Sequence, residues 1–136
     1  MTAADMAALH ALCFTMPRPW SQAEFSALLA DPTTFTLYEK AALLLGRVIL
    51  DEAELLTLAV APQARGQGLG LHLLLGFETS ARARGARCAF LEVAANNTTA
   101  LGLYLGHGWS QAGLRQHYYT NPEGQSVDAL ILTRNL

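Results

Sequence analysis

Residues 65–70, which read Arg-Gly-Gln-Gly-Leu-Gly, constrain the fold of this chain more than any other stretch. An apolar run at 55–60 precedes them, and a leucine-rich helical pattern begins directly after them. Glycines at alternate positions leave the backbone uncovered, so consecutive N–H groups can approach a ligand. At a helix N-terminus those unpaired N–H groups favour an anion, and Arg65 adds a positive charge. The strand, turn and helix therefore predict a cradle for a pyrophosphate.

Two common phosphate-binding motifs do not match this turn. The chain has no Gly-Lys-Ser/Thr of a Walker loop, and Leu71 stands where a dinucleotide fingerprint needs its third glycine. The pattern that matches is Arg-x-x-Gly-x-Gly. A glycine-rich turn that only caps an ordinary helix is the alternative interpretation, and the short motif alone does not decide between the two.

Composition indicates one compact domain covering residues 1–136. Hydrophobic residues make up 51% of the chain and charged residues 15%, which favours a buried core over disorder. A net charge of −2 provides no general attraction to nucleic acid or acidic membranes. The N-terminus lacks a basic region ahead of an apolar one, and no apolar run has the length of a bilayer, so we expect a cytoplasmic protein.

Cysteine and histidine usage indicates no metal and no disulfide framework. Cys13 and Cys88 are far apart in the sequence and form no spaced motif, which favours two reduced thiols over a single disulfide. The four histidines show no metal-ligand spacing. We therefore expect a site without metal.

The first half of the chain predicts two helices followed by three strands. Helices are expected over 3–14 and, from a Ser21–Glu24 capping box, to about residue 29. Strands over 34–38, 42–50 and 54–60 are joined by short polar breaks, which is typical of an antiparallel meander. Gly46 inside the second strand indicates a bulge or a close backbone approach.

The second half predicts a helix over 69–83, with Leu69, Leu73, Phe77 and Ala81 on one stripe. A strand over 88–93, a short helix to about 105 and strands over 109–119 and 127–133 follow. The strand–helix–strand unit implies one parallel pair with a right-handed crossover. The expected fold class is α/β: a mixed, mostly antiparallel central sheet with helices on both faces and a parallel pair at the ligand site.

Glu92 is anomalous because the strand around it, residues 89–93, is otherwise apolar and is expected to be buried on both faces. A buried carboxylate costs free energy unless it is paired or hydrogen-bonded. A general base is the functional interpretation, and a structural glutamate that faces a cleft is the alternative.

Tyr104 and Asn97 lie on or beside the short helix that follows this strand. A tyrosine phenol stays protonated at neutral pH and can donate to a departing thiolate, although core packing is the commoner role for such a residue. Asn97 has an amide that can bind a polar ligand arm, or it caps the helix. A base and an acid of this kind suit acyl transfer from a thioester to an amine.

Several separated motifs together resemble the GNAT N-acetyltransferases over essentially the whole chain. They are residues 55–60, Arg65–Gly70, Leu91–Val93, Asn96-Asn97, Ala100–Tyr104 and Gly108-Trp109. Within the family the pattern is most similar to the RimI-like branch, which acetylates a bacterial small-subunit ribosomal protein at its N-terminus. Pro19-Trp20-Ser21, Leu50–Ala53, Arg115 with Tyr118-Tyr119, and Asp128-Ala129 are further RimI-like features.

This resemblance implies the GNAT fold and acetyl-CoA as co-substrate. It implies that Glu92 is the general base and Tyr104 the general acid of a direct transfer in a ternary complex. Leu58, Ala59 and Val60 would pair with the pantetheine arm, one of their N–H groups facing the thioester oxygen, and Asn97 would contact the same arm. The remaining cofactor-binding positions implied are Arg65, Gly66, Gln67, Gly68, Leu69, Gly70 and Leu71.

The resemblance further implies that the acceptor is a protein N-terminus, such as the alanine of a ribosomal protein. We expect the enzyme itself to be a monomer or a weak dimer. Two alternatives stay open: acetylation of a lysine side chain or small amine, and a non-catalytic acetyl-CoA sensor. The sequence departs from the RimI-like pattern at Trp109, where phenylalanine is usual, and at Gln116-His117, where a more basic stretch is usual. These departures leave the acceptor open.

Overall fold

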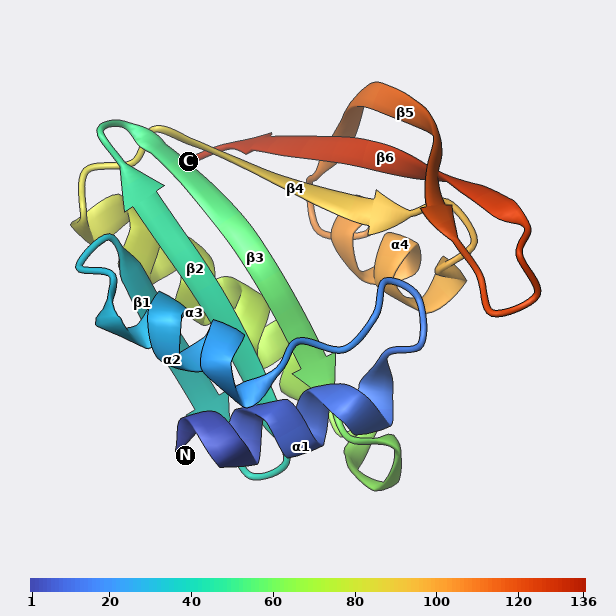
Figure 1. Cartoon of the computed structure of the whole chain (residues 1–136). Helices are drawn as coiled ribbons and strands as arrows, with labels where there is room; N and C mark the ends of the chain where they lie inside the picture. Colours follow the sequence, from blue (N-terminus) through green and yellow to red (C-terminus); the bar gives the residue numbers. More distant parts are fainter.

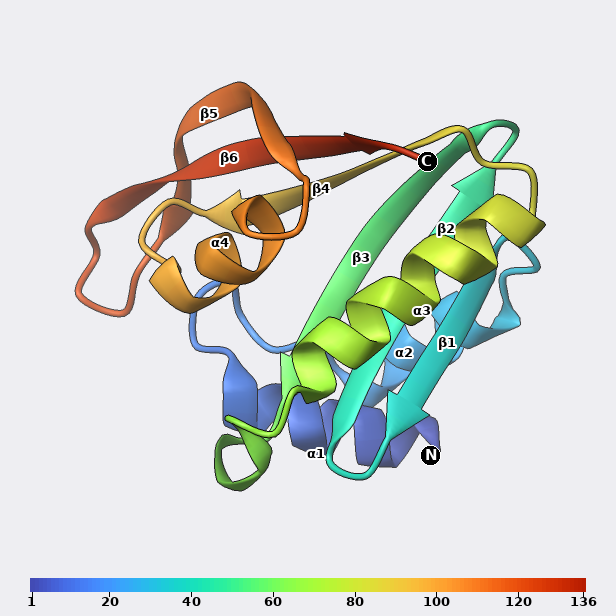
Figure 2. The same ribbon diagram turned by 180° about the vertical axis from the view of Figure 1, so that it is seen from behind.

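The computed structural model describes residues 1–136 as six strands, four α-helices and one short 3-10 turn. The elements are α1 (Ala3–Cys13), α2 (Gln22–Ala30), β1 (Thr34–Glu39), β2 (Ala42–Ile49), β3 (Glu52–Val60), η1 (Pro62–Ala64), α3 (Leu69–Ala83), β4 (Cys88–Ala94), α4 (Thr98–Leu105), β5 (Ser110–Thr120) and β6 (Ser126–Asn135). The strand order is β1-β2-β3-β4-β6-β5, and only β3 and β4 run parallel. Helices α1 and α2 cover one face and α3 and α4 the other (Figures 1 and 2), which confirms the expected α/β fold.

Local sequence signals explain where the N-terminal helices begin. Ser21 accepts a hydrogen bond from the Glu24 backbone N–H, and the Glu24 side chain accepts one from the Ser21 backbone N–H, so the predicted capping box is confirmed. Thr2 and Asp5 form the same arrangement at the start of α1. Each reciprocal pair satisfies two backbone donors that the helix itself leaves unpaired.

The core lies on both faces of the sheet: Met6, Leu9 and Phe25 of α1 and α2 belong to it on one face, and α3 packs on the other. Leu69, Leu73, Phe77 and Ala81 are all buried, so the predicted stripe faces the sheet. Full burial of a side chain such as Phe77 contributes about 1.5–3 kcal/mol relative to its exposure. The helix ends at Ala83, and Gly85 just beyond it has a φ of 92°, in the left-handed region that residues with a side chain rarely adopt.

Gly46 combines both features that were predicted for it. The register of β2 against β3 shifts between Leu45 and Gly46, which marks a bulge. A Cβ added at Gly46 would lie 2.6 Å from Phe35 Cζ and 2.9 Å from Phe77 Cδ1. The two phenylalanine rings, with centroids 5.9 Å apart, therefore pack directly over the glycine backbone.

Strands β3 and β4 are paired only where they begin. Their register covers Glu52–Glu54 against Cys88–Phe90, and beyond these residues the strands diverge (Figure 1). On its other side β3 pairs with β2 up to Val60, and β4 pairs with β6 up to Ala94. The second half of β3 thus has one edge without a neighbouring strand, in the interior of the sheet.

None of the helices combines the length and apolar character that crossing a bilayer requires.

Candidate active site

Two adjoining cavities open where β3 and β4 diverge. The first, of about 480 Å³, is lined by both strands, by the connection between α1 and α2, and by β5. The second, of about 580 Å³, is lined by the end of β3, the glycine turn and α4. Six residues line both cavities: Phe14, Met16, Leu58, Asn97, Ala100 and Tyr104. The two cavities therefore adjoin along these residues.

The glycine turn forms one wall of the second cavity. Gly66 and Gly68 have φ values of 79° and 78°, which glycine adopts without strain. Gly68 is the N-cap of α3 and has no side chain to bind the first N–H groups of the helix. Those donors and the helix dipole remain directed at the cavity, an arrangement that suits a phosphate.

The structure brings together all but one of the predicted cofactor-binding residues. Those that line the second cavity are Leu58, Ala59, Val60, Arg65, Gly66, Gly68, Leu69, Gly70, Leu71 and Asn97. Gln67 does not line it, and its side chain is exposed. Its neighbours Gly66 and Gly68 in the turn both line the cavity.

The Val60 carbonyl at the end of β3 connects this strand to α1 and to the glycine turn by hydrogen bonds. It accepts hydrogen bonds from Arg65 Nε at 3.1 Å and from Cys13 Sγ at 3.4 Å. Burial raises the pKa of the Cys13 thiol, which keeps it protonated and able to donate. Arg65 is thereby held beside the glycine turn, at the rim of the second cavity.

Glu92 lies in the first cavity, and the expectation that its strand is buried on both faces is wrong. Burial alternates along β4: Leu91 and Val93 are buried, whereas the Glu92 side chain is 24% exposed. The alternation arises because one face of β4 borders the space left by the diverging strands. Glu92 Oε1 lies 3.1 Å from Arg115 Nη2, so an ion pair with β5 offsets the cost of burying the carboxylate.

Tyr104 lies at the junction of the two cavities. It is 5% exposed and packs against Trp109 with ring centroids 5.9 Å apart. Burial raises the pKa of the Tyr104 phenol. The hydroxyl is therefore protonated at neutral pH and is available as a hydrogen-bond donor at the junction of the cavities.

Asn97 is the N-cap of α4, which was the alternative interpretation of this residue. Its Oδ1 accepts a hydrogen bond from the Ala100 N–H at 3.2 Å. The side chain also lines both cavities. Capping fixes one end of the amide and leaves its NH₂ group as the donor for a ligand.

Sequence reasoning did not assign site roles to six further residues of the first cavity: four aromatic residues, one arginine and one methionine. They are Phe14, Met16 and Trp20 from the α1–α2 connection, and Arg115, Tyr118 and Tyr119 from β5. Burial, followed by the charge of Glu92, raises the pKa of Tyr119. A usable signal was the clustering of large aromatic residues in segments without regular hydrophobic periodicity.

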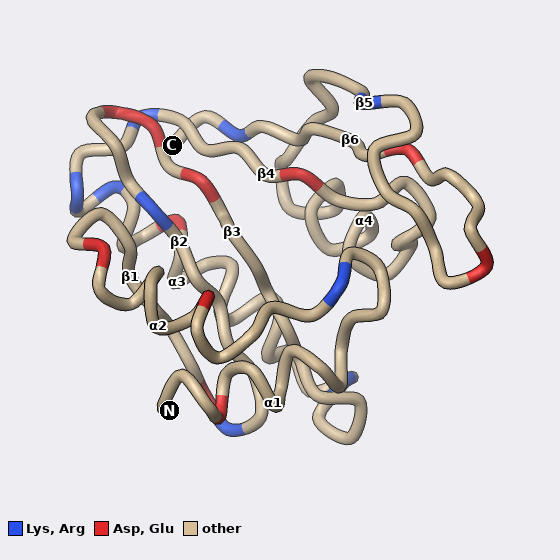
Figure 3. Tube along the Cα trace, in the orientation of Figure 1, with Lys and Arg blue, Asp and Glu red and all other residues tan.

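Charges in the first cavity occur as ion pairs. Besides Glu92 and Arg115, Glu54 Oε1 lies 2.6 Å from Arg47 Nη2. Along the whole trace, basic and acidic positions are interspersed, and neither sign occupies an entire side of the molecule (Figure 3).

Comparison with known proteins identifies the family to which this chain belongs. A sequence model of the acetyltransferase (GNAT) family matches residues 4–109. The chain belongs to the GNAT family. The expected GNAT resemblance is thereby confirmed, and the protein is an acetyltransferase of this family.

Individual GNAT relatives support the RimI-like assignment. The [ribosomal protein bS18]-alanine N-acetyltransferase of Escherichia coli K12 is 36% identical over an alignment of 118 residues. That alignment covers 84% of this chain and 79% of that protein. The crystal structure of the ribosomal-protein-S18-alanine N-acetyltransferase from Escherichia coli superposes with a TM-score of 0.87 at 28% identity. That match covers 98% of this chain and 86% of the other.

A more distant GNAT structure shares the fold. Arabidopsis thaliana NAA60, solved in complex with a bisubstrate analogue, superposes with a TM-score of 0.83 at 15% identity. The match covers 98% of this chain and 93% of that chain.

Proposed function

We propose that this protein transfers the acetyl group of acetyl-CoA to the N-terminal α-amine of a protein. The observation that supports this most is the pair of adjoining cavities, with Glu92 in one, the glycine turn in the other and Tyr104 between them. The names of the relatives make the N-terminal alanine of a small-subunit ribosomal protein the proposed acceptor. Such an acceptor places the enzyme in the cytoplasm.

In this proposal the second cavity holds acetyl-CoA. The uncovered edge of Leu58, Ala59 and Val60 pairs with the pantetheine arm as an added strand would, and one of these N–H groups faces the thioester oxygen. Backbone N–H groups of residues 66–71, Gln67 included, hold the pyrophosphate together with Arg65. The Asn97 amide contacts the pantetheine. No metal takes part.

Glu92 and Tyr104 manage the protons of the transfer. Glu92 takes a proton from the acceptor ammonium, through one water, and the neutral nitrogen attacks the acetyl carbonyl carbon. A C–N bond forms and the C–S bond breaks, while Tyr104 gives its proton to the departing sulfur. The proton that the newly acylated nitrogen then loses restores the Tyr104 phenol. An α-amine, with a pKa of about 7.7–8.0, releases its proton far more readily than a lysine amine, with a pKa of about 10.4.

Direct transfer within a ternary complex agrees with the state of the cysteine that lines the second cavity. The Cys13 thiol donates to the Val60 carbonyl, and burial raises its pKa, so little thiolate is present to act as a nucleophile. An acyl-enzyme through Cys13 is accordingly no part of the proposed mechanism.

Release of free CoA thiol from acetyl-CoA tests this function. The acceptors are a basic peptide that begins with alanine and the same peptide with a blocked N-terminus. Turnover of the free peptide alone supports α-amine transfer, whereas equal turnover of both moves the target to lysine. Binding of acetyl-CoA without turnover of either peptide contradicts the proposal and leaves a small amine or a sensor function.

A further inference from the structure

His10 is a buried residue of the first cavity that the proposed chemistry does not use. It lies on α1, is 1% exposed and lines the cavity together with Trp20 and Thr57. The Trp20 backbone N–H donates to His10 Nδ1 at 2.9 Å, and His10 Nε2 lies 2.9 Å from Thr57 Oγ1. The ring thus joins the α1–α2 connection to β3, two segments that are far apart in the sequence.

These two contacts determine which tautomer the ring adopts. A backbone N–H can only donate, so Nδ1 must present its lone pair and the proton of the neutral ring must lie on Nε2. Nε2 then donates to the Thr57 hydroxyl. Burial lowers the pKa of His10 to about 4, against a smaller opposing effect of the Glu24 charge, so the ring is neutral at pH 7.

Aromatic rings enclose the imidazole and prevent it from turning. Its centroid lies 4.3 Å from that of Phe14, 5.0 Å from that of Trp20 and 5.4 Å from that of Phe25. Phe14 and Trp20 belong to the α1–α2 connection, residues 14–21, which we call the wall loop. The same ring that binds the loop backbone therefore also packs against two of the loop side chains.

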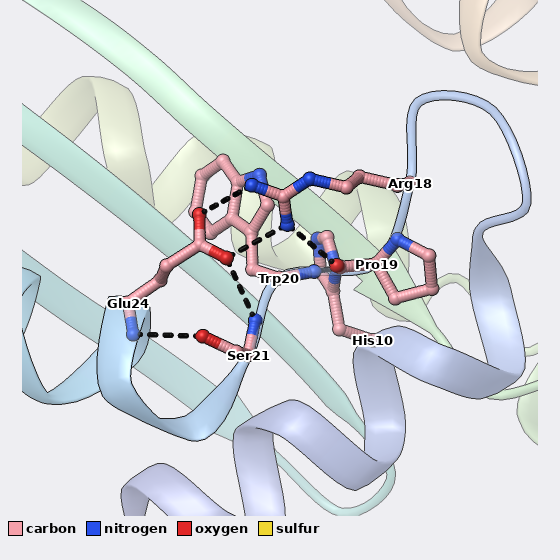
Figure 4. A network of polar contacts seen from close by, with 6 residues as sticks. All are labelled: His10, Arg18, Pro19, Trp20, Ser21 and Glu24. Atoms are coloured by element: carbon pink, nitrogen blue, oxygen red, sulfur yellow. Dashed lines mark hydrogen bonds and ion pairs between the residues drawn. The ribbon is translucent and has the colours of Figure 1, made fainter.

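A second set of contacts stabilises the wall loop on the far side of Trp20. Arg18 contacts both carboxylate oxygens of Glu24, at 2.7 and 3.2 Å, and donates to the Pro19 carbonyl at 3.1 Å. Glu24 also forms the capping box with Ser21 (Figure 4). These polar contacts lie at the exposed surface and hold the loop against α2, whereas the hydrogen bonds of the buried His10 side chain link the loop to β3.

We propose that His10 is a positioning residue for the acceptor. By donating to Thr57 and accepting from Trp20, it makes the wall loop and β3 one continuous wall of the first cavity. Phe14 and Met16 of the loop line both cavities, so their placement sets how the acceptor meets the acetyl group. This inference rests on the proposed function only where it names the first cavity as the acceptor site.

Substitutions at Thr57 and His10 test the link. Thr57→Val keeps the shape of the side chain and removes the hydroxyl, so His10 Nε2–H loses its acceptor; Thr57→Ser keeps the hydroxyl and is the matched control. His10→Phe keeps a ring and removes both hydrogen bonds. Thermal unfolding and circular dichroism first establish that each variant is folded.

Three readouts distinguish positioning from general stability. We expect Thr57→Val and His10→Phe each to raise the acceptor KM about tenfold, the effect of roughly one hydrogen bond. The dissociation constant of acetyl-CoA should stay within about twofold, because the glycine turn is not part of the link. Hydrogen exchange of the Trp20 backbone N–H should be slow in the wild type and in Thr57→Ser. It should be fast in Thr57→Val and in His10→Phe.

The double variant separates an indirect from a direct role of Thr57. If His10 acts through Thr57, combining the two substitutions adds little to either alone; if Thr57 contacts the acceptor by itself, the effects multiply and the inference is overturned. The inference is also overturned if hydrogen exchange of the Trp20 backbone N–H is unchanged in Thr57→Val. It is overturned likewise if the acceptor KM rises and the acetyl-CoA affinity falls together.

Nitrogen NMR of the wild type, without any substrate, provides an independent check. The expected spectrum has a protonated Nε2 and an unprotonated Nδ1 for His10, and the opposite tautomer contradicts the inference. The tautomer and the Trp20 exchange rate are measured without turnover, so both remain interpretable if the protein has no α-amine activity. Failure of the proposed function can therefore be distinguished from failure of the His10 inference.

Discussion

The ion pair between Glu92 and Arg115 restricts how the carboxylate can face an acceptor. Arg115 holds Oε1 from the β5 side, and its guanidinium also lies 5.3 Å from the centre of the Tyr118 ring. A guanidinium bound between a carboxylate and an aromatic face is oriented more tightly than a free surface arginine. Glu92 is thereby kept in one orientation within the cavity.

Replacing Glu92 with glutamine should abolish most turnover and leave cofactor binding intact. We expect kcat to fall about 10²–10⁴-fold, the typical contribution of general base catalysis, because the amide is similar in size but cannot accept the proton. CoA release measures kcat, and calorimetry measures acetyl-CoA affinity. Glu52→Gln, at an exposed position where β3 begins, is the control and should retain wild-type turnover. Undiminished kcat in Glu92→Gln would argue against the assigned base.

His10 should make folding stability sensitive to mild acid. Its pKa is about 4 in the folded protein against 6.5 for an ordinary histidine, so unfolding takes up a proton in this range. The stability associated with the neutral ring is complete above pH 6.5 and is lost as the pH falls toward 4, by up to about 3 kcal/mol. Urea unfolding of wild type and His10→Phe over this range should show a difference between them that changes with pH. A constant difference contradicts the prediction, since the carboxylates common to both proteins cancel.

At the scale of elements, β2 needs a glycine at position 46 because two phenylalanine rings occupy the space of a side chain there. Gly46→Ala would place a methyl group 2.6 Å from Phe35 Cζ. Overpacking of this kind costs about 1–3 kcal/mol, so a lower midpoint of thermal unfolding is expected. Gly102→Ala is the matched comparison because no atom lies within 4 Å of its added Cβ. In the interior of α4 that substitution should stabilise by about 0.5–1 kcal/mol. Equal changes in both variants would contradict this account.

Elements that bury one regular stripe could be predicted from the sequence. The boundaries of α3 agree because Leu69, Leu73, Phe77 and Ala81 recur at helical spacing and Gly85 ends the pattern. The short breaks around β2 likewise predict the meander, since few chain paths other than a hairpin fit so few residues. The glycine turn was predictable for the same local reason.

Contacts between distant segments were not predictable in this way. Glu92 meets Arg115 across β6, which lies between β4 and β5 in the sheet, and that strand order is not apparent from the sequence. The mostly exposed β5 also shows no alternation that would reveal which way its side chains point. His10 follows Met6 by four residues on the buried side of α1, a local hint of burial. Its partner Thr57 is 47 residues away, and no periodic pattern specifies such a pair.

At the scale of the whole molecule, two half-sheets are joined by very little strand pairing. The meander β1-β2-β3 and the group β4-β6-β5 share a register of three residue pairs, Glu52–Glu54 with Cys88–Phe90. The remaining connections pass through helices and side chains on either side of the two cavities. A ligand that contacts both halves should therefore couple their unfolding.

Acetyl-CoA should stabilise the protein by an amount set by its occupancy. At a concentration one hundred times its dissociation constant we expect about 2.7 kcal/mol, measured as a rise in the midpoint of thermal unfolding. Acetyl-pantetheine, which lacks the nucleotide and its pyrophosphate, should give a much smaller rise at the same concentration. If both compounds gave the same rise, the glycine turn would not be the pyrophosphate site.

The uncovered edge of β3 also makes folding stability and catalytic activity compete. A sheet gains stability when neighbouring strands pair along their full length, and substitutions that close the gap between Leu55–Val60 and Leu91–Ala94 would give this one a more complete ladder. The same closure would fill the cavities, so the most thermally stable variants would also be inactive. Selection for heat tolerance alone would then favour inactive proteins, and an engineering programme should screen turnover at every round.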